Sequence, residues 1–318
     1  MDSTFVVGID VGGQTSKIGV VDARGTVLAQ TVIRTDTYDQ VEPYIAELAE
    51  AVNKLIRESG TEGKVRGIGV GAPNGNYYTG TIENAPNLLW GRQRVEFSKL
   101  LSEAMGGLPV ALTNDANAAA VGEMTYGAAR GMKNFIMITL GTGVGSGIVI
   151  NGEVVYGHDG FAGELGHVAA VRNNGRTCGC GKTGCLETYA SATGVARTAR
   201  EWLELTDEPS VLRSLDNIAS KDVYEAAKDG DKLALKIFEF TGKILGRSFA
   251  DFIAFSSPEA IVLFGGLARA KEFLNGPIEE AMNANVLPLW RGKVKIVYSQ
   301  LKESDAAILG ASALAWEL

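Results

Sequence analysis

The feature that most limits the fold of this 318-residue chain is a pattern of strand, glycine-rich loop and strand that occurs twice. In the first copy, residues 5–10 are typical of a buried strand, residues 11–15 contain two adjacent glycines, and residues 17–21 return as a second strand. After a turn, residues 27–33 predict a third strand. This order predicts a three-stranded meander.

The second copy has the same order. An apolar strand over residues 135–140 is followed by a glycine loop over residues 141–147 and a second strand over residues 148–150. Asn151-Gly152 is typical of a hairpin turn and precedes a third short strand at residues 154–155. The repeated unit predicts an α/β chain made of two related domains.

Helices are predicted between and after the repeats. Apolar residues recur at helical spacing in residues 41–56 and 233–249, and the tail of residues 306–318 also reads as a helix. Because no low-complexity linker separates the halves, we place the boundary after residue 112. The prediction is a small N-terminal α/β domain, residues 1–112, on which the tail helix packs back, and a large C-terminal α/β domain, residues 113–305.

Composition and charge exclude several classes of protein. The chain has a formal net charge of -7 and lacks a basic run, so a nucleic-acid surface has no electrostatic support. No apolar run approaches membrane-spanning length, and the start of the chain lacks the pattern of a signal peptide. We therefore expect a cytoplasmic protein without a nucleic-acid or membrane partner.

All three cysteines, Cys178, Cys180 and Cys185, lie in one glycine-rich loop downstream of His167. Zn²⁺ favours thiolate and imidazole ligands in a tetrahedral set, which predicts a Cys₃His zinc site with His167 as fourth ligand. A disulfide or unconnected buried thiols are the alternatives, but an odd count leaves one thiol over, and Cys178 and Cys180 are too close for an unstrained bridge. His158, the other histidine, is the rival ligand and reads as a loop residue.

Three junctions between a strand and glycines favour phosphate binding. They lie at Gly12-Gly13, at residues 141–147, and at Gly265-Gly266 after a strand of residues 260–264. Phosphate oxygens need close backbone N–H donors, and glycine leaves them accessible. Each loop alone is weak evidence, and none matches the Walker A or Rossmann spacing, but three in a duplicated chain indicate ATP.

Several motifs together resemble the ROK family of bacterial sugar kinases and repressors, nearly end to end. The motifs are Asp10-Val-Gly-Gly13, Asn114-Asp115-Ala-Asn117, Leu140-Gly-Thr-Gly-Val-Gly-Ser-Gly147, Glu164-Leu-Gly-His167, Cys178-Gly-Cys-Gly-Lys-Thr-Gly-Cys-Leu-Glu187 and Ile261-Val-Leu-Phe-Gly-Gly266. The resemblance is greatest to the ATP-dependent glucokinases of that family. It implies the two-domain actin-like, hexokinase-like ATPase fold, built of duplicated ribonuclease-H-like domains with a zinc-binding loop. It also implies phosphorylation of a hexose by ATP, with glucose giving glucose 6-phosphate.

The resemblance makes Asp115 the candidate general base and gives Asn114 a sugar hydroxyl to bind. From the residues alone, an Asx turn or a helix N-cap at Asn114 or Asp115 explains these two residues as well as a catalytic role does. Glu164 and Glu187 flank the metal ligands, and carboxylates accept pairs of sugar hydroxyls, although isolated glutamates are usually surface charges. With Gly75 and His167 they complete the predicted sugar site, which a structural zinc ion would order.

For the nucleotide, the resemblance implies Mg²⁺ handled by Asp10, usually through water. The residues predicted to bind ATP with Asp10 are Gly12, Gly13, Lys17, Gly141, Thr142, Gly143, Gly265 and Gly266. Two positions depart from the family pattern. Gln14 replaces the usual threonine after the paired glycines, where Thr15 could supply the hydroxyl instead. Asn74 follows a proline where the family commonly has glycine, and Asn74, Gly75 and Asn76 either approach the sugar or form a turn.

Three alternatives stay open. Within the kinases, the sugar could be an N-acetylhexosamine (N-acetylglucosamine or N-acetylmannosamine), fructose or allose, because pocket shape decides between them and motifs do not. A sugar-responsive repressor of the family carries an N-terminal helix-turn-helix domain, whereas here the first strand begins at about Thr4, which favours an enzyme. A chaperone-like ATPase leaves the cysteine loop unexplained. A homo-oligomer, either dimer or tetramer, is implied by resemblance.

Overall fold

The computed structural model describes residues 4–318, except for the side chains of residues 303 and 304. Contacts divide the chain into two compact units. Unit 1 consists of Met1–Met132, Gly147–Gly163 and Ser299–Leu318, and unit 2 of Lys133–Ser146 and Glu164–Tyr298. Residues 113–132, which the sequence predicts to be part of the large domain, therefore belong to unit 1.

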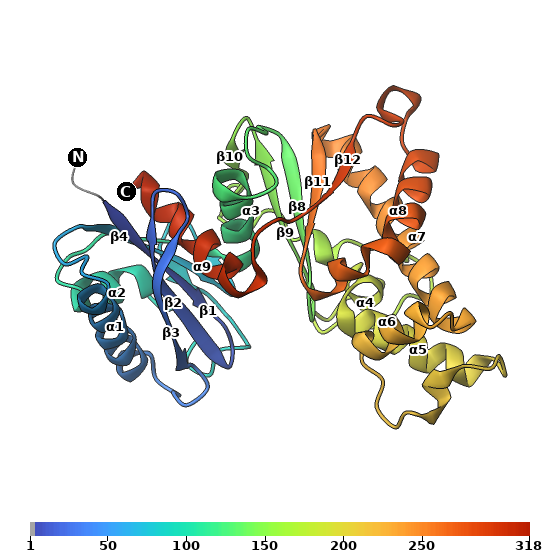
Figure 1. The fold of residues 1–318 in the computed structure, drawn as a ribbon, viewed down its shortest axis with the longest axis horizontal. Coiled ribbons are helices and arrows are strands. Elements are labelled where there is room, and N and C mark those ends of the chain that lie inside the picture. The colour runs from blue at the N-terminus through green and yellow to red at the C-terminus, as the bar shows by residue number, and fades with distance from the viewer. Residues whose placement is uncertain (1–3) are drawn as a thin grey trace. The chain divides into compact units, whose positions relative to one another are not determined.

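Unit 1 is built on a five-stranded sheet (Figure 1). Its strand order is β3-β2-β1-β4-β7, in which β1, β2 and β3 pair antiparallel while β4 and β7 run parallel to β1. The strands are β1 (Phe5–Val11), β2 (Thr15–Asp22), β3 (Val27–Arg34), β4 (Val65–Ala72) and β7 (Val110–Asn114). The predicted three-stranded meander is confirmed, and the parallel strands bring the ends of β1, β4 and β7 to one edge.

Helices cover this sheet, and a two-stranded hairpin lies beside it. The helices are α1 (Val41–Glu58), α2 (Phe97–Ala104), α3 (Asp115–Tyr126) and α9 (Glu303–Leu314). The hairpin consists of β5 (Gly75–Asn76) and β6 (Thr81–Ile82). The red helix α9 lies against the blue strands in Figure 1. It packs so closely on β1 and β4 that a methyl group at Gly8 or Gly69 would overlap its backbone carbonyls.

The second sheet has the order β10-β9-β8-β11-β12, with β8, β11 and β12 in unit 2. Its strands are β8 (Phe135–Leu140), β9 (Val144–Ile150), β10 (Glu153–Val154), β11 (Ala260–Phe264) and β12 (Lys295–Tyr298). The predicted loop over residues 141–147 was too long, because residues 144–147 belong to β9. Position 147 in this strand has no room for a side chain, because a Cβ atom there would lie 2.8 Å from the Cβ of Ala120.

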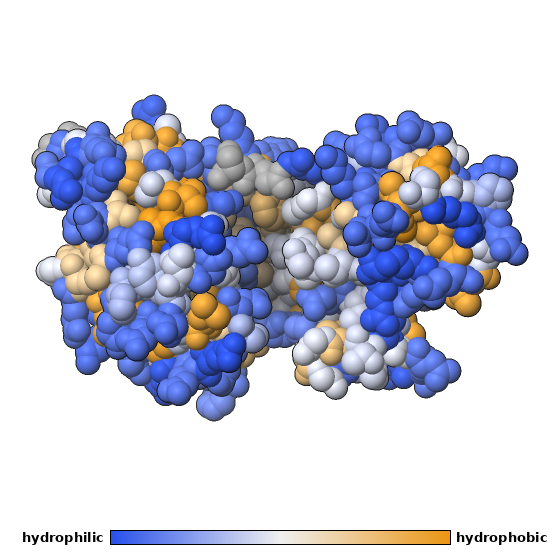
Figure 2. Space-filling model, turned by 90° about the horizontal axis from the view of Figure 1, so that it is seen from below, coloured by the Kyte–Doolittle hydropathy of each residue, from blue (hydrophilic) through white to orange (hydrophobic). Residues whose placement is uncertain are grey.

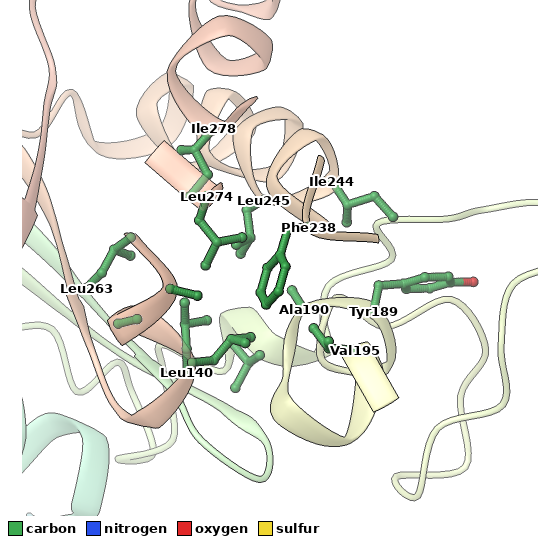
Figure 3. Close-up of a cluster of buried hydrophobic side chains, with 14 of the residues drawn as sticks. Leu140, Tyr189, Ala190, Val195, Phe238, Ile244, Leu245, Leu263, Leu274 and Ile278 are labelled. Carbon is green, nitrogen blue, oxygen red and sulfur yellow. The ribbon is translucent and has the colours of Figure 1, made fainter. Parts of the chain in front are cut away.

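The core of unit 2 lies between the helices and the sheet. The helices are α4 (Glu187–Ala190), α5 (Ala192–Leu205), α6 (Ser220–Lys228), α7 (Lys232–Ser256) and α8 (Lys271–Asn285). Short 3₁₀ turns in this unit are η1 (Leu165–His167), η2 (Val211–Ser214), η3 (Gly266–Ala270) and η4 (Pro288–Trp290). A fifth turn, η5 (Ala315–Glu317), belongs to unit 1. Figure 3 shows Phe238 of α7 pointing into the cluster between Leu245 and Val195. This apolar core supports the short helix α4, which begins at Glu187.

The surface of the chain is mostly hydrophilic on the face in view in Figure 2, where hydrophobic side chains appear as separate patches. Within residues 4–318, none of the helices combines the length and the apolar character that a membrane crossing requires.

Candidate functional site

Asp10, Lys17 and Asp115 form a group of charges in unit 1. Asp10 lies opposite Lys17 in the β1–β2 pairing, and Asp115 follows β7 at the same edge of the sheet. Burial raises the pKa of Asp10 to about 6, the negative charge of Asp115 adds to this increase, and Lys17 opposes it. The structure therefore brings together three residues that were predicted separately.

Asp115 is the first residue of α3, and Asn114 is its N-cap. The backbone N–H of Ala116 donates to Asn114 Oδ1 and to Asp115 Oδ1, at 2.8 Å each. The Asp115 side chain stays accessible to solvent, although desolvation by the surrounding protein raises its pKa against the lowering effect of these backbone N–H groups. The capping interaction considered from the sequence is present at Asn114, and it holds Asp115 at a helix start.

The glycines of the first predicted phosphate loop form a tight turn. The N–H of Gly12 donates to the carbonyl of Thr15 at 3.0 Å. Gly13 lies so close to the carbonyl of Asn87 that a Cβ atom would be 2.8 Å from it. Gln14 is exposed, and its carbonyl accepts from the N–H of Thr35. Close packing alone is therefore enough to require glycine at position 13.

Asn74, which departs from the family pattern, is a turn residue. It has a φ of 52°, and its side-chain amide donates to the carbonyls of Glu83 and Asn84 at 3.0 and 2.9 Å. Gly75 follows in β5, where a Cβ atom would lie 2.5 Å from the carbonyl of Thr113. The buried side chain of Asn76 donates to the carbonyl of Asp159 at 2.7 Å. These residues hold the hairpin beside the strand that leads to Asp115.

In unit 2, the loop of Gly141, Thr142 and Gly143 turns its three carbonyls toward protein donors. The carbonyl of Gly143 accepts from the Gly141 N–H at 3.0 Å, and that of Gly141 accepts from the Ala192 N–H at 2.8 Å. The carbonyl of Thr142 accepts from the Thr193 hydroxyl at 2.7 Å. The motifs gave no sign of these two α5 residues, which lie about 50 positions downstream of the loop.

Glu187 connects this loop to the cysteine loop. Its Oε2 accepts from the N–H of Val144 at 2.9 Å and occupies the space that a side chain at Gly143 would need. Its Oε1 lies 3.9 Å from the sulfur of Cys178. From the sequence Glu187 is expected only as a sugar ligand, and no motif indicates its contact with the glycine loop.

Gly265 and Gly266 follow β11, which runs parallel to β8, so the two glycine loops of unit 2 lie at the same edge of their sheet. Gly265 has a φ of 102°, and a Cβ atom there would lie 2.6 Å from the carbonyl of Leu140. Gly266 has open space around its Cα. The backbone conformation and close packing thus explain why residue 265 is glycine, whereas the space beside Gly266 could hold a ligand.

The four predicted metal ligands come together in unit 2. Ligand atoms of His167, Cys178, Cys180 and Cys185 all lie within 4.8 Å of one another. Cys178 Sγ is 3.7 Å from His167 Nδ1, and Cys180 Sγ is 3.7 Å from Cys185 Sγ. Zinc–sulfur bonds of about 2.3 Å in a tetrahedron require separations of about 3.8 Å, so the donor set fits Zn²⁺. The cysteines form no disulfide, and His158 is an exposed loop residue outside the cluster.

Glu164 comes directly before η1, the 3₁₀ turn that carries His167. Because Nδ1 of His167 faces the thiols, Nε2 is the ring nitrogen left for another partner. Lys182 donates to the carbonyl of His167 at 2.7 Å, which ties the cysteine loop to this turn. Glu187 and the turn that carries His167 thus both contact the cysteine loop.

Comparison with known proteins identifies the chain. The model of the ROK family matches residues 6–317. The glucokinase of Halalkalibacterium halodurans is 38% identical over 315 residues, which are 98% of this chain and 94% of that protein. A ROK family glucokinase from Streptomyces griseus, solved with glucose and AMPPNP, has a TM-score of 0.80 and 32% identity, covering 99% of this chain and 100% of that one.

A ROK family transcriptional regulator, described as a homolog of the Escherichia coli MLC protein, has a TM-score of 0.88 and 28% identity, covering 98% of this chain and 78% of its own. Enzymes and a regulator therefore share this fold, and the predicted α/β fold of the hexokinase-like kind is confirmed. Since the family model covers nearly the whole sequence, the chain belongs to the ROK family.

Proposed function

We propose that this protein transfers the terminal phosphoryl group of ATP to a hexose, and that glucose is the hexose, giving glucose 6-phosphate. The observation that carries the proposal is Asp115, an accessible carboxyl group with a raised pKa beside Asp10 and Lys17. The full-length similarity to glucokinases, one of them solved with glucose and AMPPNP, supports this choice of substrates.

Asp115 acts as the general base. It takes the proton from the attacking sugar hydroxyl as that oxygen bonds to phosphorus and the bond to the departing ADP breaks. A raised pKa suits this role because a base works best when its pKa is nearer the working pH. Asn114 already uses its Oδ1 on the helix, so its amide would meet the sugar as a donor.

Asp10 would hold Mg²⁺, whose chemical contribution is to neutralise charge on the phosphates. The carbonyls of residues 141–143 are used in hydrogen bonds within the protein. The N–H groups of Thr142 and Gly143 would therefore be the groups of this loop that bind phosphate. We assign Gly12, Gly13 and Lys17 to the phosphates as well. Gly265 and Gly266 would lie against the adenosine.

The sugar would be bound by Gly75, Glu164, His167 and Glu187. His167 would present Nε2 while Nδ1 binds zinc, and Glu187 would present the oxygen that Val144 does not use. Zn²⁺ held by His167 and the three cysteines would fix the loop that carries these groups, and its role is structural. A cytoplasmic location and a homo-oligomer, dimer or tetramer, remain predictions that accompany this function.

A panel of sugars tests the proposed reaction. With ATP and Mg²⁺, we expect the highest kcat/KM for glucose in a coupled assay, and little ATP hydrolysis when sugar is omitted. A preference for N-acetylglucosamine, N-acetylmannosamine, fructose or allose would replace glucose as the substrate. ATP turnover that does not depend on any sugar would contradict the kinase itself.

Replacing the proposed base should separate catalysis from binding. Asp115→Asn should lower kcat by about 10²–10⁴-fold, because the amide cannot accept the hydroxyl proton. Calorimetric affinities for glucose and ATP should change little. The exposed Asp39→Asn serves as the control and should keep full activity. A variant at residue 115 that retains most of its kcat would remove Asp115 from this role.

The charge on Asp10 should cost stability. Its folded pKa of about 6 exceeds the unfolded value of 3.8, so the folded state binds more protons and loses stability as pH rises through this window. Asp10→Asn should therefore raise the free energy of unfolding at pH 7 by about 1–3 kcal/mol, and by much less near pH 4. Thermal melts without Mg²⁺ at both pH values measure this. The same change at both pH values would contradict it.

The metal site gives a matched pair of histidine variants. The purified chain should carry one zinc ion, measured by elemental analysis, and His167→Ala should bind it more weakly because one ligand is lost. His158→Ala should retain the metal, since His158 is exposed and lies outside the cluster. Absence of zinc from the unmodified chain would refute the site.

A further inference from the structure

Arg176 is a buried arginine to which the proposed function gives no task. It lies two residues before Cys178, and its side chain is only 8% exposed. Arginine is rarely buried unless its charge is paired and its donors are used. The partners of this guanidinium therefore indicate which parts of the fold it holds together.

One set of partners lies on either side of the last cysteine, Cys185. Arg176 Nη1 donates to the carbonyl of Thr188 at 2.8 Å, and the guanidinium lies over the Tyr189 ring, 4.5 Å from its centroid. The backbone of Arg176 also accepts from the Gly184 N–H at 2.8 Å and donates to the Tyr189 hydroxyl at 2.9 Å. Figure 3 shows Tyr189 at the edge of the core with its hydroxyl pointing outward. Arg176 thus connects the two ends of the cysteine loop.

The other partners lie on α5. Arg176 Nε donates to Glu201 Oε2 at 3.0 Å, and Nη2 donates to the Thr198 hydroxyl at 3.0 Å. Glu201 Oε1 accepts in turn from Arg197 Nε at 2.7 Å, and Arg197 Nη1 reaches the carbonyl of Thr177 at 3.3 Å. The first arm of the cysteine loop is therefore fastened to a long helix.

None of these contacts uses a ligand atom of the candidate metal site, so they do not need the ion. We propose that Arg176 is a positioning residue that holds the ends of the cysteine loop in the metal-binding arrangement before zinc arrives. The affinity for zinc then depends on Arg176, because a preformed loop loses less conformational freedom on binding. This inference rests on the proposed metal site but not on the kinase reaction.

The test measures zinc affinity on the full chain under reducing conditions, by competition with a chromogenic chelator. Arg176→Met keeps the apolar stem and removes the donors, and we expect affinity to fall by about 10–100-fold. The control is Arg200→Met, because Arg200 is exposed and donates to the carbonyl of Ile218, away from the loop. Its zinc affinity should equal that of the unmodified chain.

A milder variant covers the case in which Arg176→Met does not fold. Glu201→Gln retains the shape of the partner and weakens its charge-assisted hydrogen bonds, so zinc affinity should fall by a smaller factor. If the two residues act as a unit, the double variant should bind zinc no more weakly than Arg176→Met alone.

Circular dichroism of the zinc-free proteins decides whether each variant is folded. Unchanged zinc affinity in a folded Arg176→Met protein overturns the proposal, and so does unchanged affinity in Glu201→Gln if the first variant is unfolded. An unmodified chain that binds no zinc overturns the metal site together with this inference. Loss of kinase activity with normal zinc affinity contradicts the proposed function of Arg176 and leaves the metal site intact.

Discussion

The hydrogen bond from the Val144 N–H to Glu187 joins the two loops of unit 2 that carry most of its candidate functional residues. It joins the first residue of β9 to the first residue of α4, which begins two residues after the last cysteine. Gly143 has no side chain because this carboxylate occupies the space. The glycine loop and the cysteine loop therefore both contact Glu187.

Unit 1 accepts an unfavourable electrostatic arrangement at the end of its sheet. Asp10 and Asp115 carry like charges, and burial adds to the free energy needed to ionise Asp10. Lys17 offsets only part of this effect. Perturbed carboxyl groups of this kind are more frequent at functional sites than elsewhere, which is the physical reason for assigning the chemistry to this group of residues.

Local patterns explain which features could be predicted from the sequence. The meander follows from alternating strands and turns, and the metal cluster follows from ligand types at close spacing. The start of β9 was missed because glycine and serine give a weak strand signal. For Asn74 the sequence left a turn and a sugar contact as alternatives, and its φ and hydrogen bonds show the turn. The contacts of Glu187 with Val144 and of Arg176 with Glu201 join residues distant in sequence, and no motif records such pairs.

The packing of α9 on β1 and β4 has a consequence for folding during synthesis. Gly8 and Gly69 leave space for this helix, so a sheet whose strands precede unit 2 in the sequence is covered by a helix that follows unit 2. Until α9 emerges from the ribosome, that face of the sheet lacks its apolar partner, while all of unit 2 has already been translated. We expect unit 1, which needs α9 to complete its core, to be the later of the two to reach its final structure.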